Sequence, residues 1–288
     1  MVTHTATEAI LVLLKKLRAH GQIVYVPSII CSSVEYLLEW YGAEVAYYDP
    51  LEEVGNDNFE KASIIIWVPY FGYSRGPKSN LLQKLPKSCK VIIDSAHSPI
   101  VAKNLRNSFG DREVYVVSSS RKITGLEDNV SITNRGAEIQ VDVSNAEVSC
   151  AYDYIMKRSR SFGFFTFFML CVAKIGLIAR PPTAPVYEKR VYKKESVVKL
   201  VNKKHKQLRE RREIRGKALI SMRVTKTLVP MWDTDPDDVI WCVPICIGSF
   251  RSVLLRSIII SLRGKSTFIW PHYAKKNKTG SFFLCGKL

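Results

Sequence analysis

The first half of the chain alternates between short apolar runs and longer segments in which apolar residues recur at helical spacing. The apolar runs, each bounded by polar or turn-forming residues, are residues 22–26, 43–49, 62–68, 90–94, 113–117 and 129–133. The segments with helical spacing are residues 7–18, 31–42 and 79–85. Continuous apolar strands that alternate with helices are typical of a parallel sheet covered on both faces. We therefore expect an α/β fold for this half.

The second half follows another pattern. Residues 161–179 are almost wholly apolar, interrupted by Lys174, and we interpret them as a core or dimer-interface helix. A membrane span or in-plane anchor is the alternative, because a span needs roughly 20 apolar residues. Residues 186–217 carry 13 basic and 4 acidic residues and are expected to form a long helix with a solvated basic face. A small α+β unit completes this half, with strands at 239–247 and 266–270 and a helix at 250–264.

Charge divides the chain near residue 150. Residues 1–150 hold 15 basic and 17 acidic side chains, whereas residues 151–288 hold 28 basic and 9 acidic ones. We therefore expect a large α/β domain over 1–150 and a smaller basic domain over 151–288. The basic half is expected either to be solvated or to meet an anionic partner, such as a membrane surface contacted through residues 161–217. Its basic segment lacks the interleaved aromatic residues of a single-strand binder, which argues against nucleic acid.

Several kinds of chemistry have no motif in this sequence. There is no complete Gly-x-x-x-x-Gly-Lys-Ser/Thr phosphate loop, no Gly-x-Gly-x-x-Gly after the first strand and no Gly-x-Ser-x-Gly elbow. The five histidines have no metal-ligand spacing and the seven cysteines are scattered singly, so we predict free thiols and no metal site. The polar N-terminus does not resemble a secretory signal, so we expect a cytoplasmic protein, with membrane association as the alternative.

Two charged residues lie at or shortly beyond the ends of apolar runs. Asp94 ends the run 90–94, and Lys122 comes just after the run 113–117, behind three serines. Taken singly, an Asp-Ser pair is typical of a turn, and a lysine before a turn is usually exposed. Together with the alternating strands and helices, they suggest pyridoxal phosphate, which needs a lysine amine and a carboxylate beside its pyridine nitrogen. The helix start HTATEAI could supply the amides and hydroxyls that bind the cofactor phosphate.

Segments spread in order over residues 3 to about 134 resemble one known family. The segments are THTATEAILVLL, VYVPSIICSSVEYLLEWYGAEVAYYD, IIIWVPYFGYS, VIIDSAHS and SSSRKITGLEDNVSIT. They are similar to the motifs of the DegT/DnrJ/EryC1/StrS-type sugar aminotransferases, a branch of the fold-type-I pyridoxal-phosphate enzymes. The resemblance implies a three-layer, mostly parallel sheet with a small α+β C-terminal domain.

The resemblance also assigns roles to individual residues. Lys122 would be the Schiff-base lysine and the acid-base group, and Asp94 would pair with the pyridinium nitrogen. The resemblance also implies further cofactor contacts. Ala6 and Thr7 would bind the phosphate at the helix start, and Ser119 would add a hydroxyl to the same phosphate site. Cys31 would lie beside the ring, and His97 would contact the ring hydroxyl. The implied activity is that of a homodimeric aminotransferase, with glutamate as amino donor and a keto sugar on a nucleotide carrier as acceptor.

The sequence departs from the family pattern at several points. It begins at the phosphate-binding helix and stops soon after FIWPHY, so it looks shortened at both ends. The turn after Lys122 reads Glu127-Asp128-Asn129 where glycines are usual. Two alternatives therefore stay open. One is a pyridoxal-phosphate enzyme of another reaction type, and the other is a shortened non-catalytic relative that binds a membrane or nucleic acid.

Overall fold

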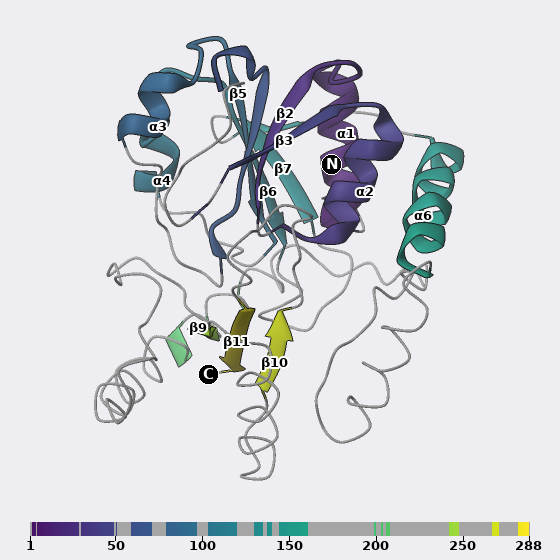
Figure 1. Cartoon of the computed structure of the whole chain (residues 1–288), viewed down its shortest axis with the longest axis vertical. Coiled ribbons are helices and arrows are strands. Elements are labelled where there is room, and N and C mark those ends of the chain that lie inside the picture. The colour runs from purple at the N-terminus through teal and green to yellow at the C-terminus, as the bar shows by residue number, and fades with distance from the viewer. Residues whose placement is uncertain are drawn as a thin grey trace.

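A mixed sheet of eight strands organises the first half of the protein. Figure 1 shows the computed structural model. The structure describes residues 2–3, 5–28, 30–48, 50, 59–70, 79–96, 103–119, 130–134, 137–139, 144–160, 199, 203, 206–207, 242–247, 267–270 and 282–287. The strands of this sheet are β1 (Val2–Thr3), β2 (Ile23–Pro27), β3 (Glu44–Tyr48), β4 (Ile64–Trp67), β5 (Lys90–Ser95), β6 (Val114–Ser119), β7 (Val130–Asn134) and β8 (Ala137–Glu138).

The strand order is β1-β7-β6-β5-β4-β2-β3, with β8 paired to β7. Strands β2 to β6 are all parallel, whereas β7 runs antiparallel to both β6 and β1. Strand β1 consequently runs in the same direction as β6. The predicted α/β fold with a mostly parallel sheet is confirmed, and the six apolar runs correspond to β2 through β7.

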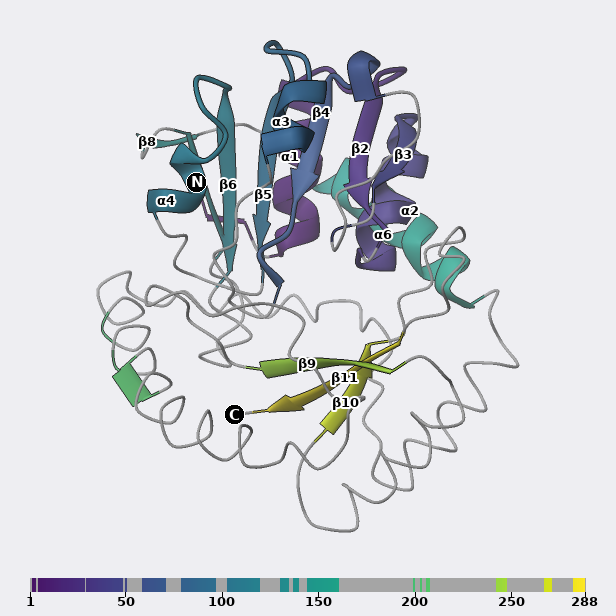
Figure 2. The same cartoon turned by 60° about the vertical axis from the view of Figure 1, so that its left-hand side comes forward.

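Helices cover both faces of this sheet (Figure 2). They are α1 (Ala6–Lys16), α2 (Ser32–Tyr41), α3 (Ser79–Lys84), α4 (Lys103–Asn107) and α6 (Asn145–Arg160), with a short 3-10 turn, η1 (Phe59–Lys61). The helices α1, α2 and α6 share one apolar layer with alternate residues of the strands, such as Ile92 and Val117. The helices α3 and α4 share the other layer, to which the neighbouring residues Ile93 and Val116 belong. This alternation follows from the two-residue repeat of a strand.

Helix α1 is the most deeply buried helix of the first layer. Its residues 9–14 are all buried, because the sheet and the neighbouring helices enclose it. Thr5 caps its N-terminus, where the hydroxyl Oγ1 accepts a hydrogen bond of 3.1 Å from the backbone N–H of Glu8. Lys15 and Lys16 lie in its last turn, which suits the negative end of the helix dipole.

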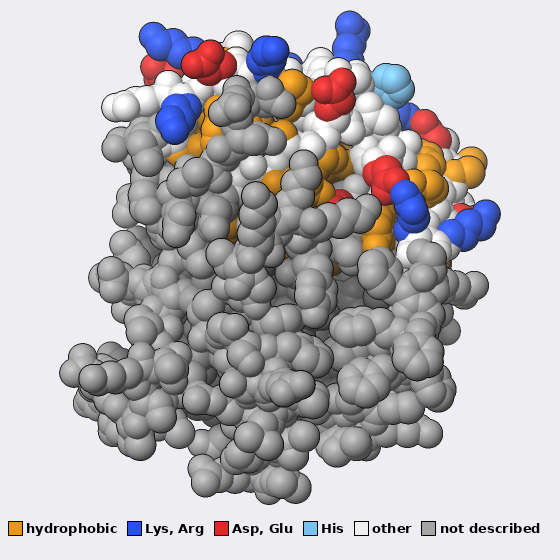
Figure 3. All heavy atoms as spheres, viewed as in Figure 1, with side chains coloured by type: hydrophobic (Ala, Val, Ile, Leu, Met, Phe, Trp, Pro, Cys, Tyr) orange, Lys and Arg blue, Asp and Glu red, His pale blue; other side chains and the backbone are white. Residues whose placement is uncertain are grey.

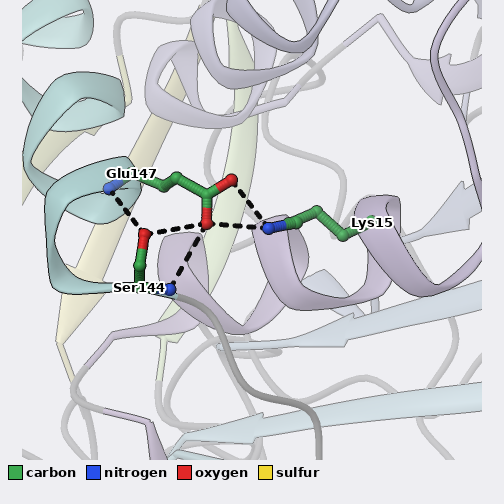
Figure 4. A network of polar contacts seen from close by, with 3 residues as sticks. All are labelled: Lys15, Ser144 and Glu147. Carbon is green, nitrogen blue, oxygen red and sulfur yellow. Dashed lines mark hydrogen bonds and ion pairs between the residues drawn. The ribbon is translucent and has the colours of Figure 1, made fainter.

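Helix α6 is held by a capping box and by ion pairs to two other helices. Figure 4 shows the capping box and the ion pair with Lys15. Ser144 Oγ accepts from the backbone N–H of Glu147 at 3.3 Å, and Glu147 Oε2 accepts from the backbone N–H of Ser144 at 3.3 Å. Both carboxylate oxygens of Glu147 also lie 2.7 Å from Lys15 Nζ on α1. Near the other end of α6, Arg158 forms an ion pair with Glu39 of α2.

The described part of the second half contains an antiparallel sheet of three strands in the order β10-β11-β9. These strands are β9 (Cys242–Ile247), β10 (Thr267–Trp270) and β11 (Phe282–Lys287). The strands expected at 239–247 and 266–270 are therefore present, and β11 is an additional one. The segments 161–179 and 250–264 lie outside the described residues. Within the segment 186–217, the described residues are helical, namely Lys199, Lys203, Lys206 and Gln207.

Charges of both signs lie on the face of the described part that Figure 3 shows. On the face shown in Figure 3, Lys and Arg side chains are interspersed with Asp and Glu side chains over the upper part of the molecule. Among the described residues, no helix is both long enough and apolar enough to cross a lipid bilayer.

The composition boundary near residue 150 falls inside α6, which packs against α2. The division into domains 1–150 and 151–288 therefore stays a prediction.

The capping box predicts an acid-dependent loss of stability. The pKa of Glu147 lies below its ordinary value, first because Lys15 hydrogen-bonds the carboxylate and next because Ser144 does. The stabilisation is therefore present above the pKa of an unfolded glutamate and is lost as the pH falls through the lower, folded-state pKa. We expect Glu147→Gln to lower the urea midpoint at pH 7. Between pH 7 and pH 3, the midpoint of this variant should fall less than that of the unmodified protein.

A matched control for that experiment is Asp153→Asn, which removes an exposed carboxylate from the same helix. We expect this variant to keep the urea midpoint and acid dependence of the unmodified protein. Equal effects of the two substitutions would show that the contacts of Glu147 with Lys15 and Ser144 contribute nothing specific to stability.

Candidate active site

The register of the sheet brings several predicted residues to the side where the parallel strands have their carboxyl ends. This side is called the carboxyl edge of the sheet below. Strands β5 and β6 are parallel, with Asp94 opposite Val117, so their carboxyl ends lie side by side. Ser119, the last residue of β6, is opposite Val130 of β7, and Val130 is opposite Thr3, the last residue of β1. Because α1 follows β1 after two residues, its N-terminus lies at the same edge. Parallel α/β sheets carry their ligand sites at this edge.

Asp94 and Ser119 also lie on the same face of the sheet. Asp94 is two residues beyond Ile92, and Ser119 is two residues beyond Val117. Both apolar residues belong to the layer that α1, α2 and α6 cover, and side chains two residues apart in a strand point to the same face. Asp94 and Ser119 therefore face the layer in which α1 begins. Each has only 7% of its surface exposed.

The carboxylate of Asp94 serves the local turn as well. Its Oδ1 accepts a hydrogen bond of 3.1 Å from the backbone N–H of Ala96. This contact is that of an Asx turn. A turn is one of the two roles that the sequence suggests for Asp94. A carboxylate is also a strong acceptor for a positively charged or N–H-bearing group.

The N-terminus of helix α1 is electrostatically positive, in contrast to the carboxylate of Asp94. Ala6 and Thr7 are its first two residues, and both are half-buried. The backbone N–H groups of a first helical turn have no partner within the helix, and the dipole makes this end positive, so it attracts anions. The edge therefore combines a buried acceptor, Asp94, with an anion-binding helix end and the hydroxyl of Ser119. Such a site suits a ligand with an N–H group at one side and a phosphate at the other.

A contact that the sequence did not reveal fixes the start of α1. The side chain of Thr5, the N-cap, is hydrogen-bonded to the hydroxyl of Tyr152 on α6. These two residues are 147 positions apart, so no local pattern could have connected them. The helix start that the resemblance implies at Ala6 and Thr7 is where α1 begins, whereas nothing in the sequence pointed to Tyr152.

Cys31 lies at the N-cap position of α2, just beyond the carboxyl end of β2. It is exposed, and its Sγ is 3.0 Å from Ser33 Oγ. Since β2 runs parallel to β4 and β5, the thiol is at the same edge of the sheet as Asp94. Cys89 differs, because it is buried and desolvation raises the pKa of its thiol to about 12. Cys31 is therefore the accessible thiol of these two.

Lys122 and His97 lie outside the described residues. Each follows an edge residue by three positions, Lys122 after Ser119 and His97 after Asp94. Their assigned roles stay predictions, as do the cofactor contacts of Ala6, Thr7, Cys31 and Ser119. The structure does bring Asp94, Ser119 and the start of α1 to one face of one edge, as the resemblance requires.

Comparisons with known proteins find similarity at the level of the fold. No protein-family model matches the sequence, and no curated protein is significantly similar to it. Among solved structures, the aminotransferase TlmJ from Streptoalloteichus hindustanus is 15% identical with a TM-score of 0.59, and the match covers 100% of this chain and 79% of TlmJ. A candidate pyridoxal-phosphate-dependent aminotransferase from Bacillus cereus is 13% identical with a TM-score of 0.61, over 100% and 80% of the two chains.

A third similar structure is a candidate sugar aminotransferase from Streptococcus pneumoniae in its pyridoxal-phosphate form. It is 14% identical with a TM-score of 0.54, and the match covers 94% of this chain and 72% of that one. At such low identities the comparison establishes the architecture alone. The protein thus has the fold of the fold-type-I pyridoxal-phosphate transferases.

Proposed function

We propose that the protein binds pyridoxal 5'-phosphate at the carboxyl edge of its sheet and is an aminotransferase. The observation that carries this proposal is the placement of the buried Asp94 carboxylate on the same edge and face as the N-terminus of α1. The fold supports it, because solved structures with this architecture include pyridoxal-phosphate-dependent aminotransferases.

The donors and acceptors at the edge fit the cofactor chemically. The phosphate is a dianion, and the amides of Ala6 and Thr7 with the hydroxyl of Ser119 would bind it. The pyridine ring carries a nitrogen that must stay protonated, and the Asp94 carboxylate would hold that proton by an ion pair. Lys122 would supply the amine that attaches the cofactor, and His97 would contact the ring hydroxyl.

Bound pyridoxal phosphate would supply an electron sink for the substrate carbon. The work of the chain itself would then be to hold charges and move one proton. Asp94 would keep the ring nitrogen cationic, because a carboxylate favours the protonated form of a neighbouring base. The Nζ of Lys122 would accept the proton that leaves the substrate carbon and would then donate it to a carbon of the cofactor.

The substrates that we propose are glutamate as amino donor and a keto sugar on a nucleotide carrier as acceptor. The support for the sugar is the resemblance of residues 3–134 to the sugar aminotransferases, together with the similar fold of the Streptococcus pneumoniae protein. The excess of basic residues after residue 150 suits a substrate that carries a diphosphate. We further propose that the enzyme acts as a cytoplasmic homodimer.

The attachment residue can be tested by colour. Purified protein supplied with pyridoxal phosphate should show a visible absorbance band, and Lys122→Ala should abolish it because the amine that forms the attachment is lost. The matched control is Lys90→Ala, since Lys90 begins β5 at the opposite edge of the sheet and should leave the band intact. A colourless unmodified protein, or a band that survives in Lys122→Ala, would contradict the proposed site.

The reaction type needs a separate measurement. Adding glutamate without a sugar should convert the visible band to that of the amine form of the cofactor and release one equivalent of 2-oxoglutarate per bound cofactor. A protein that binds the cofactor but does not respond to glutamate would be a pyridoxal-phosphate enzyme of another type or one with another donor. A protein that binds no cofactor would be the non-catalytic relative.

A further inference from the structure

The hydroxyl of Tyr152 reaches from α6 to the cap of α1. Its partner is Thr5 Oγ1, the same atom that accepts from the backbone N–H of Glu8 and so shapes the first turn of the helix. Tyr152 thereby contacts the residue that directly precedes the proposed phosphate-binding amides of Ala6 and Thr7.

Two further features fix the position of that hydroxyl. Helix α6 buries Val148, Ala151 and Ile155 in the apolar layer that it shares with α1 and α2, so the helix cannot easily rotate about its axis. Glu147, near the start of α6, is bonded to Lys15 at the end of α1, whereas Tyr152, further along, is bonded to the start of α1. The two helices therefore run in opposite senses and are joined at both ends of α1.

We infer that Tyr152 is a positioning residue for the phosphate of the cofactor, acting through Thr5. This inference rests on the proposed function. Hydrogen bonds from helix amides to an anion weaken steeply when the donors move out of line, so the placement of the helix start decides how well a phosphate is held. A bond between α6 and the cap fixes that placement relative to Asp94 and the sheet.

The inference predicts a loss that depends on the phosphate group of the ligand. Tyr152→Phe keeps the ring and removes only the hydroxyl, and we expect it to weaken binding of pyridoxal phosphate on the order of threefold to tenfold, the effect of one hydrogen bond. Binding of pyridoxal, which has no phosphate, should be unchanged. The phosphorus NMR signal of the bound cofactor should also shift, because its environment changes.

Two controls separate this role from a general effect on folding. Tyr154→Phe removes a hydroxyl on the same helix that contacts Arg158 rather than α1, and it should leave both affinities unchanged. In a Thr5→Ala background, Tyr152→Phe should have no further effect, because contacting residues that act as a unit are not additive.

The outcomes distinguish this inference from the proposed function. If unmodified protein binds no pyridoxal phosphate, both are overturned. If it binds the cofactor through Lys122 but Tyr152→Phe binds pyridoxal phosphate as tightly as before, the inference alone is wrong. Equal weakening toward pyridoxal phosphate and pyridoxal, or full additivity with Thr5→Ala, would likewise overturn it, since either result shows a role unrelated to the phosphate.

Discussion

The common direction of strands β2 to β6 is the constraint on which the candidate site depends. Residues at the ends of separate strands become neighbours only because the carboxyl ends of parallel strands meet at one edge. Asp94 and Ser119 owe their shared position to the pairing of β5 with β6, and α1 begins at the same edge because β7 pairs antiparallel with both β6 and β1. A shift of one residue in any of these pairings would turn a site residue to the other face.

Helix α6 completes this arrangement from outside the sheet. It is bonded to both ends of α1, and to α2 through Arg158, so three helices of one layer hold each other in place. An exposed ion pair contributes little stability alone, and here the larger effect is geometric. The same contacts that keep the layer together also fix the helix end where we propose that a phosphate binds.

Much of the fold could be predicted from the sequence because the central strands are buried on both faces. Such strands are continuous apolar runs, and each of the six runs forms a strand. Asp94 was predictable for the same reason, since it ends one of these runs. Helix α6 was not predicted because its few buried residues, Val148, Ala151 and Ile155, lie among polar ones. The bond between Tyr152 and Thr5 is purely tertiary and has no local signal.

We propose above that this edge of the sheet holds pyridoxal phosphate on Lys122. The most direct measurement is to incubate the whole protein with the cofactor, reduce the attachment with borohydride and locate the added pyridoxyl group by peptide mass spectrometry. Modification of one site, the peptide that contains Lys122, is the predicted result. Modification spread over the lysines of the basic segment 186–217, or none at all, would show that Lys122 does not hold the cofactor.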